Sequence, residues 1–344
     1  MSDCIKRPSV ASAQRVWSGR WRKSVLALFG LALSSQGLLW AQATPEPYPS
    51  RPLKIVVPFG PGSGTDTATR MLAQRLEVAL KQAVVVENRP GANGAIASVA
   101  VARAAPDGLT LLMGTNSTHG ANPGLVAKLG YDPIKDFVPI GMIATFSSFL
   151  VVHPSVPVRT PAELMALIKA DAKGLSFAAG NTSSLMMGEM FARRAGAPML
   201  RVPYQSNPLG LTDVIAGRVQ VMFPDISSSL AHVQSGAVRV LGVVSMGGRS
   251  AQAPDVPTLA EGGINDFNFV GWIGLFAPAG TPDAIVRRLG DELERLVKMP
   301  EVGQRLQQIG ADPRAMGPAE FGPFVRSEVD RLPRLLAAIG IQPQ

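Results

Sequence analysis

A glycine-rich turn early in the chain has the residue types that bind an anion through the backbone. The stretch VPFGPGSGTD, residues 57–66, lies between an apolar run and a helical pattern. Such a turn leaves N–H groups free at the positive end of a helix dipole, where small residues let an anion approach. The alternative is an ordinary connection with Asp66 or Thr65 capping the helix. The candidate contacts are Phe59, Gly62, Ser63, Gly64, Thr65 and Asp66.

The same turn does not match the common phosphate-binding motifs. It lacks the Lys-Ser/Thr ending of a P-loop. Counting from Gly62 and Gly64, Thr67 stands where a G-x-G-x-x-G motif needs its third glycine. Phosphate cofactors are therefore disfavoured, and we expect no cofactor.

Two further turns repeat the pattern of a strand followed by small polar residues. FAAGNTSSLMMGEMF, residues 177–191, offers Asn181, Thr182, Ser183 and Ser184, and LLMGTNSTHGANP, residues 111–123, offers Thr115 and Asn116. Ligands of open α/β sheets bind at the carboxyl ends of strands, so these turns could face one cleft. We expect one anion to be held between two of them. Tyr204 ends another predicted strand and is a further candidate contact.

Enzyme chemistry has weak support in the sequence. The three histidines, His119, His153 and His232, share no metal-ligand spacing, and no G-x-S-x-G or S-x-x-K motif is present. A nucleophile without a placed base is inert, so a hydrolase or isomerase using the Ser/Thr-rich turns is the weaker hypothesis. We predict no catalytic residue and no metal site.

Short β-branched runs alternate with helical patterns along residues 44–344, which is typical of sheets flanked by helices. Helix starts are indicated by the capping boxes at Thr160–Glu163 and Thr258–Glu261 and by Thr281-Pro282. We expect the final helix, 318–339, to be interrupted at Pro333. The predicted strands are 53–57, 84–87, 109–114, 149–152, 175–179, 200–204, 219–223, 238–244 and 272–277.

Residues 1–43 are typical of a secretory signal peptide. Four basic residues between 15 and 23 precede an uncharged apolar stretch, 25–40, and a small-x-small site ends at Ala43. A membrane anchor is the alternative, but its apolar segment needs about 20 residues. We therefore expect export to the periplasm with cleavage near Ala43.

The basic character of the chain belongs largely to this N-terminal segment. The whole chain has a formal charge of +8, but without residues 1–43 Lys+Arg falls from 33 to 27 and Asp+Glu from 25 to 24, which leaves +3. A nucleic-acid partner is therefore not supported. The single cysteine, Cys4, also lies in this segment, so the exported chain contains no thiol.

Seven segments in order resemble the Bug-type receptors of tripartite tricarboxylate transporters, from Tyr48 to the C-terminus. They are YPSRPLKIVVPFGPGSGTD, VVVENRPGANG, AVARAAPDGLTLLMGT, LVVHPSVPVRTPAEL, VPYQ, DVPTLAEGG and GLFAPAGTP. The resemblance implies a periplasmic binding protein of type II, with two α/β lobes, each a mixed or mostly parallel sheet flanked by helices. It also implies a small carboxylate held by the turns at 62–66 and 181–184, largely through N–H groups and bridging waters.

The chain departs from the family pattern at three places. Asn181 stands for a glycine and Leu185 for a histidine, and Pro224-Asp225 replaces the usual Asp-Asn. A carboxylate at Asp225 would repel a dianion and favour an ammonium, amide or hydroxyl on the far end of the ligand. The alternative interpretation is an N-cap for the helix that follows.

The sequence thus predicts a solute receptor and not an enzyme. Its lobes are expected at 44–150 plus 273–344 and at 151–272, joined by crossing segments near 149–153 and 270–273. The resemblance implies delivery of a small carboxylate to membrane permease subunits by a monomeric receptor. A sensor that presents its closed form to a signalling partner is the alternative within the binding class.

Overall fold

The computed structural model describes residues 48–171, 174–245, 248–265, 267 and 269–343. The chain divides into two units, Met1–Glu46 and Pro47–Gln344, and every described residue belongs to the second unit. The predicted export segment and its cleavage site lie outside the described residues. In the described part of the chain, no helix combines the length and apolarity that a membrane crossing requires.

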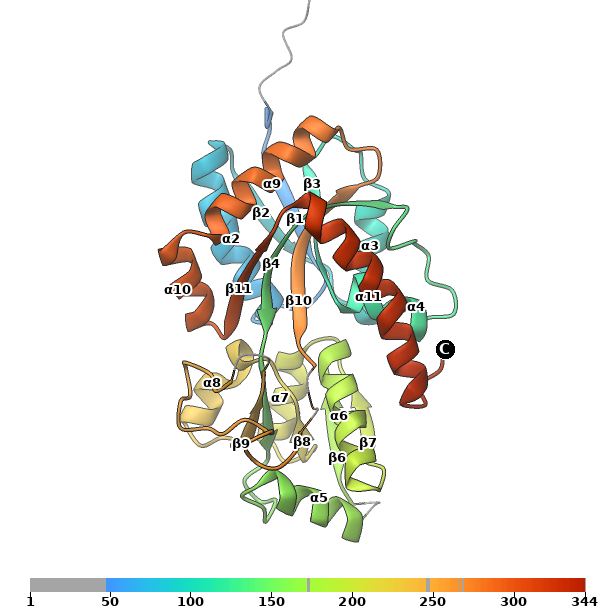
Figure 1. Cartoon of the computed structure of the whole chain (residues 1–344), viewed down its shortest axis with the longest axis vertical. Helices are drawn as coiled ribbons and strands as arrows, with labels where there is room; N and C mark the ends of the chain where they lie inside the picture. Colours follow the sequence, from blue (N-terminus) through green and yellow to red (C-terminus); the bar gives the residue numbers. More distant parts are fainter. Residues whose placement is uncertain (1–47, 172–173, 246–247, 266, 268, 344) are drawn as a thin grey trace, which may run out of the picture. The chain divides into compact units, whose positions relative to one another are not determined.

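The first sheet, sheet A, has six strands in the order β11-β4-β10-β3-β1-β2 (Figure 1). Its β1 lies parallel to β2 and β3, whereas β10 and β11 lie antiparallel to their neighbours. The apolar run of β1 is almost wholly buried, as expected for a strand covered on both faces. The strands are β1 (Leu53–Val57), β2 (Val84–Asn88), β3 (Thr110–Thr115), β4 (Phe137–Phe146), β10 (Gly271–Pro278) and β11 (Ala311–Met316).

Helices and short turns accompany sheet A. Val286, Leu289 and Leu293 of α9 share one hydrophobic cluster with β1 and β3. These elements are α2 (Gly64–Leu80), η1 (Ala92–Gly94), α3 (Ala95–Ala102), η2 (Ser117–Ala121), α4 (Asn122–Leu125), α9 (Asp283–Val297), α10 (Pro300–Gln308) and α11 (Pro318–Ala338).

The second sheet, sheet B, has five strands in the order β7-β6-β8-β5-β9. Its β6 lies parallel to β7 and β8, and β5 lies antiparallel to β8 and β9. The strands are β5 (Ser148–Val152), β6 (Ser176–Ala179), β7 (Leu200–Pro203), β8 (Val221–Met222) and β9 (Arg239–Val244). The helices beside them are α5 (Pro161–Ala170), α6 (Thr182–Ala195), α7 (Asn207–Ile215) and α8 (Ile226–Gln234).

The predicted α/β class with two mixed sheets is confirmed, and each predicted strand overlaps an observed one. Strands β4 and β11 were not predicted. Two local predictions are wrong. The residues 258–261 make the reciprocal bonds of a capping box, but Thr258 forms an isolated bridge with Val243 and residues 259–261 form a turn in place of the predicted helix. Helix α11 continues through Pro333, whose ring packs beside Gly124.

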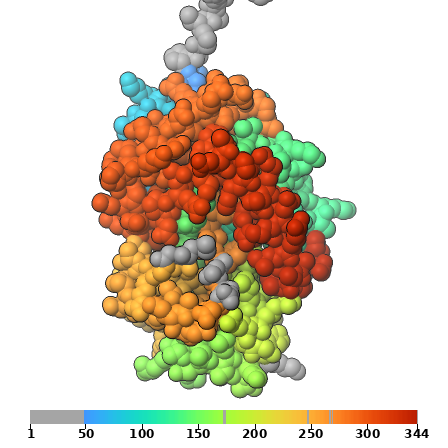
Figure 2. Space-filling model, in the orientation of Figure 1, coloured from blue at the N-terminus to red at the C-terminus, as the bar shows by residue number. Residues whose placement is uncertain are grey.

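Two features tie α11 and β10 to the region between the sheets. Leu332 and Leu336 of α11 belong to the same hydrophobic cluster as Phe191 of α6. Figure 2 shows the red C-terminal residues against the yellow-green ones, and Arg193 donates a hydrogen bond to the carbonyl of Ala338 at 3.2 Å. In β10, buried Trp272 donates its indole N–H to Glu328 at 3.0 Å.

Candidate functional site

The glycine-rich turn after β1 leads directly into α2. Ser63 is the N-cap, and its side chain accepts a hydrogen bond from the N–H of Asp66 at 3.2 Å. The prediction that Asp66 or Thr65 caps this helix is therefore wrong. Ser63 takes the role because its backbone is extended, at φ −66° and ψ 157°, so its hydroxyl can reach the third N–H of the helix.

Asp66 instead fixes the shape of the turn. One carboxylate oxygen accepts the N–H of Gly62 at 2.9 Å, and the other accepts hydrogen bonds from Arg70 and Asn88. The N–H of Gly62 is thus already used, contrary to the expectation that it is free for a ligand. The N–H of Thr65 has no acceptor among the described residues. That group and the neighbouring N–H of Gly64 remain at the positive end of α2.

The turn after β6 is built in the same way at the start of α6. Asn181 and Ser184 form a reciprocal capping box, with the N–H of Ser184 donating to Asn181 Oδ1 at 2.9 Å. The N–H of Thr182 donates to Ser117 Oγ at 3.2 Å, which joins α6 to η2 beside sheet A. The N–H of Ser183 has no acceptor within the described part of the chain.

The third predicted turn satisfies most of its own hydrogen bonds. Thr115 Oγ1 accepts the N–H groups of Ser117 and Thr118, so it is directed into the turn and not toward a ligand. Asn116 does reach across, because its side chain donates to Ser183 Oγ at 3.2 Å. Of this pair of candidates, only Asn116 is brought together with the α6 turn.

Asp225 lies between the first and second turns. It occupies the N-cap position of α8, as the alternative interpretation predicted, but its side chain makes no capping hydrogen bond. Its carboxylate accepts a hydrogen bond from Asn207 Nδ2 at 2.9 Å. The N–H of Gly64 and the side chain of Asn181 are also close enough to this carboxylate to lower its pKa. The two turns, one beside each sheet, therefore converge on a single carboxylate of the chain itself.

Burial is the main influence on the protonation of Asp225. Desolvation raises its pKa to about 6, and the hydrogen bonds from Asn207, Gly64 and Asn181 only partly oppose that rise. None of these three groups carries a charge. Asp66 of the first turn is paired with Arg70, and Asp312 bonds to Ser147 near the other side of Asp225. The described surroundings of Asp225 thus hold no cation paired with it.

The raised pKa predicts that Asp225 stabilises the folded protein at low pH and not at high pH, which is the reverse of the usual contribution of an aspartate. Because the folded protein binds the proton more tightly than the unfolded chain does, Asp225 favours folding below its ordinary pKa of 3.8. That contribution is lost as the pH rises through about 6, and amounts to about 3 kcal/mol. Denaturant unfolding of wild type and Asp225→Asn should show the variant gaining relative stability between pH 4 and pH 7.5. A constant difference would contradict the assignment.

A cleft of about 470 Å³ opens beside the second turn, at Asn181. Elements accompanying both sheets line it, through Asn93 of η1, Asn181 and Leu185 of the α6 turn, and Arg201 and Tyr204 at β7. Tyr204 lines the cleft with its ring, while its hydroxyl donates to Asp213 at 2.7 Å. Leu185, which replaces the family's histidine, makes this wall apolar.

The wall formed by η1 has a strained backbone. Ala92 and Asn93 both have positive φ, at 47° and 50°, although neither is glycine. Such strain is often found at ligand sites because the surrounding structure has to maintain it. Here Asn93 donates to Asn122 and to Thr182 Oγ1, both at 2.8 Å, which joins η1 to the α6 turn.

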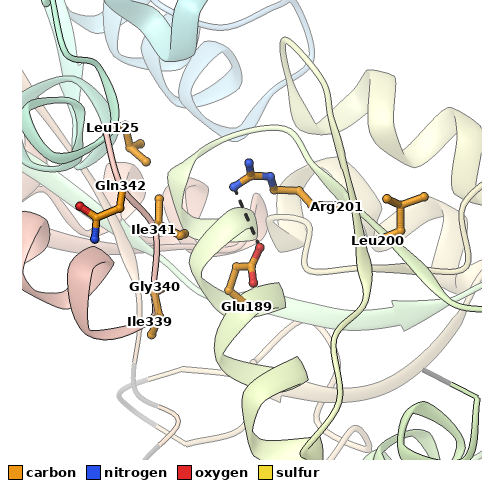
Figure 3. Close-up of a pocket in the computed structure, with 8 residues that line it drawn as sticks. All are labelled: Leu125, Glu189, Leu200, Arg201, Ile339, Gly340, Ile341 and Gln342. Atoms are coloured by element: carbon orange, nitrogen blue, oxygen red, sulfur yellow. Dashed lines mark ion pairs between the residues drawn. The ribbon is translucent and has the colours of Figure 1, made fainter. Parts of the chain in front are cut away.

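A second cavity, of about 510 Å³, lies next to this cleft (Figure 3). Leu125 and Arg201 line both spaces, and the C-terminal residues Ile339 to Gln342 line the second. Figure 3 shows Arg201 and Glu189 directed toward one another, with a separation of 4.0 Å. Desolvation raises the pKa of Glu189. Arg201 is the cation that lines the cleft itself.

The remaining candidates and the histidines fit structural roles. Phe59 is buried, and its carbonyl accepts a hydrogen bond from Asn88. His119 is wholly buried, stacks on Phe276 at 3.8 Å and lies 3.0 Å from Thr118 Oγ1. Because His119 and Thr118 are both wholly buried, this possible Thr–His pair cannot reach a substrate. Among the described residues, no group of three or more acidic, His or Cys side chains could hold a metal.

Several residues at the site were missed by sequence reasoning. Asn207 and Ser227 contact or border Asp225 and Gly64, and Asn93 and Arg201 line the cleft. A signal existed for Asn207, since Ser206-Asn207-Pro208 follows a predicted strand and is typical of a helix start. No comparable signal marked Ser227 or Arg201.

Comparisons with known proteins agree with this geometry. A family model described as "Tripartite tricarboxylate transporter family receptor" matches residues 68–341. The chain is 32% identical to protein BugT of Bordetella pertussis over 310 residues, covering 89% of this chain and 94% of BugT. It also resembles the solved periplasmic binding protein BugD, with a TM-score of 0.81, 30% identity, and coverage of 86% of this chain and 100% of that chain.

A further solved structure was determined with a ligand. Rpa4515 of R. palustris with adipate has a TM-score of 0.83 and 30% identity, over 86% of this chain and 100% of that chain. These likenesses confirm the predicted two-lobed binding-protein fold.

Proposed function

Because the chain belongs to the tripartite tricarboxylate transporter receptor family, we propose that it binds a small carboxylate between its lobes and delivers it to the permease subunits of such a transporter. The receptors of this family are solute-binding proteins and not enzymes. A relative binds adipate, which supports a carboxylate as the ligand class here.

One observation carries the proposal. The helices α2 and α6 accompany different sheets, yet Gly64 and Asn181 at their first turns both lie close enough to Asp225 to lower its pKa, and a Cβ on Gly64 would stand 3.3 Å from Asp225 Oδ2. The N–H groups of Thr65 and Ser183 lie in these same turns and have no acceptor among the described residues. Two helix N-termini with spare donors favour a negatively charged group between them.

We assign ligand contact to the predicted residues that the two turns hold together. These are Gly64, Thr65, Asn116, Asn181 and Ser183, with Tyr204 at the wall of the cleft. Ser63, Asp66 and Ser184 support the turns, and Gly62, Phe59, Thr115 and Thr182 make internal hydrogen bonds.

We propose that the receptor has two lobes divided as predicted, 44–150 plus 273–344 and 151–272, and the strand content of the two sheets supports a division within a few residues of these bounds. Sheet A draws its strands from 53–146 and 271–316, and sheet B from 148–244. The chain therefore changes sheets near Ser147 and again before Gly271. We propose that these two crossings act as the hinge, with ligand favouring closure by its higher affinity for the closed state.

The family of periplasmic receptors implies the periplasm as the location. We propose that residues 1–43 direct export and are removed near Ala43, and that the receptor acts as a monomer.

Calorimetry and thermal unfolding with a panel of carboxylates test the function. The panel includes mono-, di-, hydroxy- and amino-carboxylates, and adipamide, which has no carboxylate, serves as the control. A ligand at a hundredfold excess over its Kd should stabilise the protein by about 3 kcal/mol and be recovered unchanged. The proposal is wrong if no carboxylate binds, or if adipamide binds as well as the acids do.

A further inference from the structure

The wall of the site opposite Gly64 presents hydrogen-bond acceptors. Asn207 is 1% exposed, and its amide N–H donates to the carboxylate of Asp225. Since an ionised carboxylate can only accept, the Asn207 amide must keep this orientation. Its carbonyl oxygen, Oδ1, is then left buried with no partner among the described residues. Buried polar atoms normally have partners, so an orphaned acceptor points to a missing donor.

The orphaned oxygen faces the second turn. A Cβ placed on Gly180 would stand 2.6 Å from Asn207 Oδ1 and 2.5 Å from the backbone of Ser206 and Asn207, so a glycine here lets the second turn pack closely against Asn207. This position immediately precedes Asn181, which both contacts Asp225 and lines the 470 Å³ cleft. Asn207 therefore contacts both Asp225 and the turn whose Asn181 lines the cleft.

A second orphaned oxygen lies on the same wall. Ser227 Oγ is buried and has no partner in the described residues. It would stand 2.7 Å from a Cβ on Gly64, and Asp225 Oδ2 would stand 3.3 Å from the same point. The carboxylate of Asp225 and Asn207 Oδ1, which only accept, and Ser227 Oγ, whose hydroxyl can accept as well as donate, are together called the acceptor wall below.

The acceptor wall has no compensating cation. Arg70 is engaged by Asp66, and Arg201 lies in the cleft with Glu189 as its ionic partner. A buried carboxylate without a cation is costly unless a donor from elsewhere satisfies it. A second carboxylate brought to this wall would add like-charge repulsion to that cost.

We propose that the ligand carries a hydrogen-bond donor as well as its carboxylate, and that the acceptor wall binds the donor. The ligand class is thus an amino-, amido- or hydroxy-carboxylate, and not a simple dicarboxylate such as the adipate bound to Rpa4515. This inference rests on the proposed function, because it assumes a carboxylate receptor. Asp225 is then a specificity-determining residue, and Asn207 holds it in place.

Ligands matched in length separate the donor from the charge. Calorimetry at pH 7.5 compares 6-aminohexanoate, 6-hydroxyhexanoate and adipic monoamide with adipate, and repeats the comparison with five-carbon chains. At least one donor-bearing acid should bind more tightly than the dicarboxylate of equal length, by roughly tenfold or more. In Asp225→Asn this preference should disappear or reverse, because the like-charge repulsion is removed.

Two variants guard against ambiguous results. Asp291→Asn removes one charge from an exposed position on α9 and should keep the wild-type preference. Ser227→Ala deletes an unpartnered hydroxyl, so the variant should fold normally. It should weaken the binding of donor-bearing acids several-fold more than the binding of adipate. It provides a second test if Asp225→Asn does not fold.

The outcomes distinguish this inference from the function on which it rests. If no carboxylate of any class binds, the proposed function fails. If adipate binds as tightly as every donor-bearing acid, the proposed receptor function is supported, but the acceptor wall does not select ligands with a hydrogen-bond donor. The inference would also be overturned if wild type, Asp225→Asn and Ser227→Ala all showed the same preference for donor-bearing acids over adipate.

Discussion

Gly64→Val should weaken carboxylate binding by roughly 10- to 100-fold while leaving the protein folded. The Cβ alone would lie 2.7 Å from Ser227 Oγ, 3.1 Å from the ring of Phe146 and 3.3 Å from Asp225 Oδ2. The contacts with Ser227 and Asp225 join α2 beside sheet A to the start of α8 beside sheet B, whereas Phe146 belongs to β4 of sheet A. A receptor that opens as proposed can relieve the clash by separating the two helices, so the cost falls on the closed, ligand-bound state.

A matched substitution isolates this effect from a general loss of glycine. Gly64→Ala should already weaken binding, although by less than valine. Gly303→Ala on α10 is the control, because the nearest atom to its added Cβ is 3.7 Å away. Calorimetry gives the affinities and thermal unfolding reports the fold. Wild-type affinity in Gly64→Val would remove the first turn from the binding site.

Acid should destabilise the protein through His119 by about 5 kcal/mol between pH 6.5 and pH 3. Complete burial lowers the pKa of His119 from 6.5 to about 3. Below pH 6.5 the unfolded chain takes up a proton that the folded protein does not, so stability falls as the pH falls. The contribution is fully present above pH 6.5. This slope is opposite in sign to that from Asp225.

His119→Phe removes the titrating ring and keeps an aromatic group beside Phe276 and Phe137. His119 Nε2 has no partner among the described residues, so the variant loses only the hydrogen bond with Thr118. Urea unfolding from pH 8 to pH 4 should show similar stabilities at pH 8 and a smaller loss toward acid in the variant. Parallel curves would show that His119 is not the group responsible.

The sequence predicted those elements whose patterns are local. Strand β1 begins and ends where the pattern indicates, because its apolar residues and flanking turns are unambiguous. Strands β4 and β11 were missed because Pro139, Gly141 and Pro313 resemble loop residues. They pair antiparallel, and β4 is held by β10 and β11 on its two sides, which is a tertiary effect. Pro333 likewise stays helical because α11 packs against η2 and α4.

The candidate site was predictable as a set of turns but not as a set of free donors. Composition alone shows that the Gly62–Asp66 and Asn181–Ser184 turns could bind an anion. It does not show that Asp66 takes the N–H of Gly62, or that Asp225 is surrounded by Asn207, Gly64 and Asn181. Those pairings join residues far apart in the chain, and only the fold decides them.

If residues 1–43 are removed as proposed, the indole of Trp272 gives the remaining chain its own spectroscopic label. The chain has four tryptophans, and Trp17, Trp21 and Trp40 precede the expected cleavage position. The remaining one donates to Glu328 and, through its carbonyl, accepts the N–H of Asn116. Asn116 in turn bonds to Ser183 of the opposite turn. Emission from this one fluorophore would therefore report lobe movement in the unmodified protein, without an added dye.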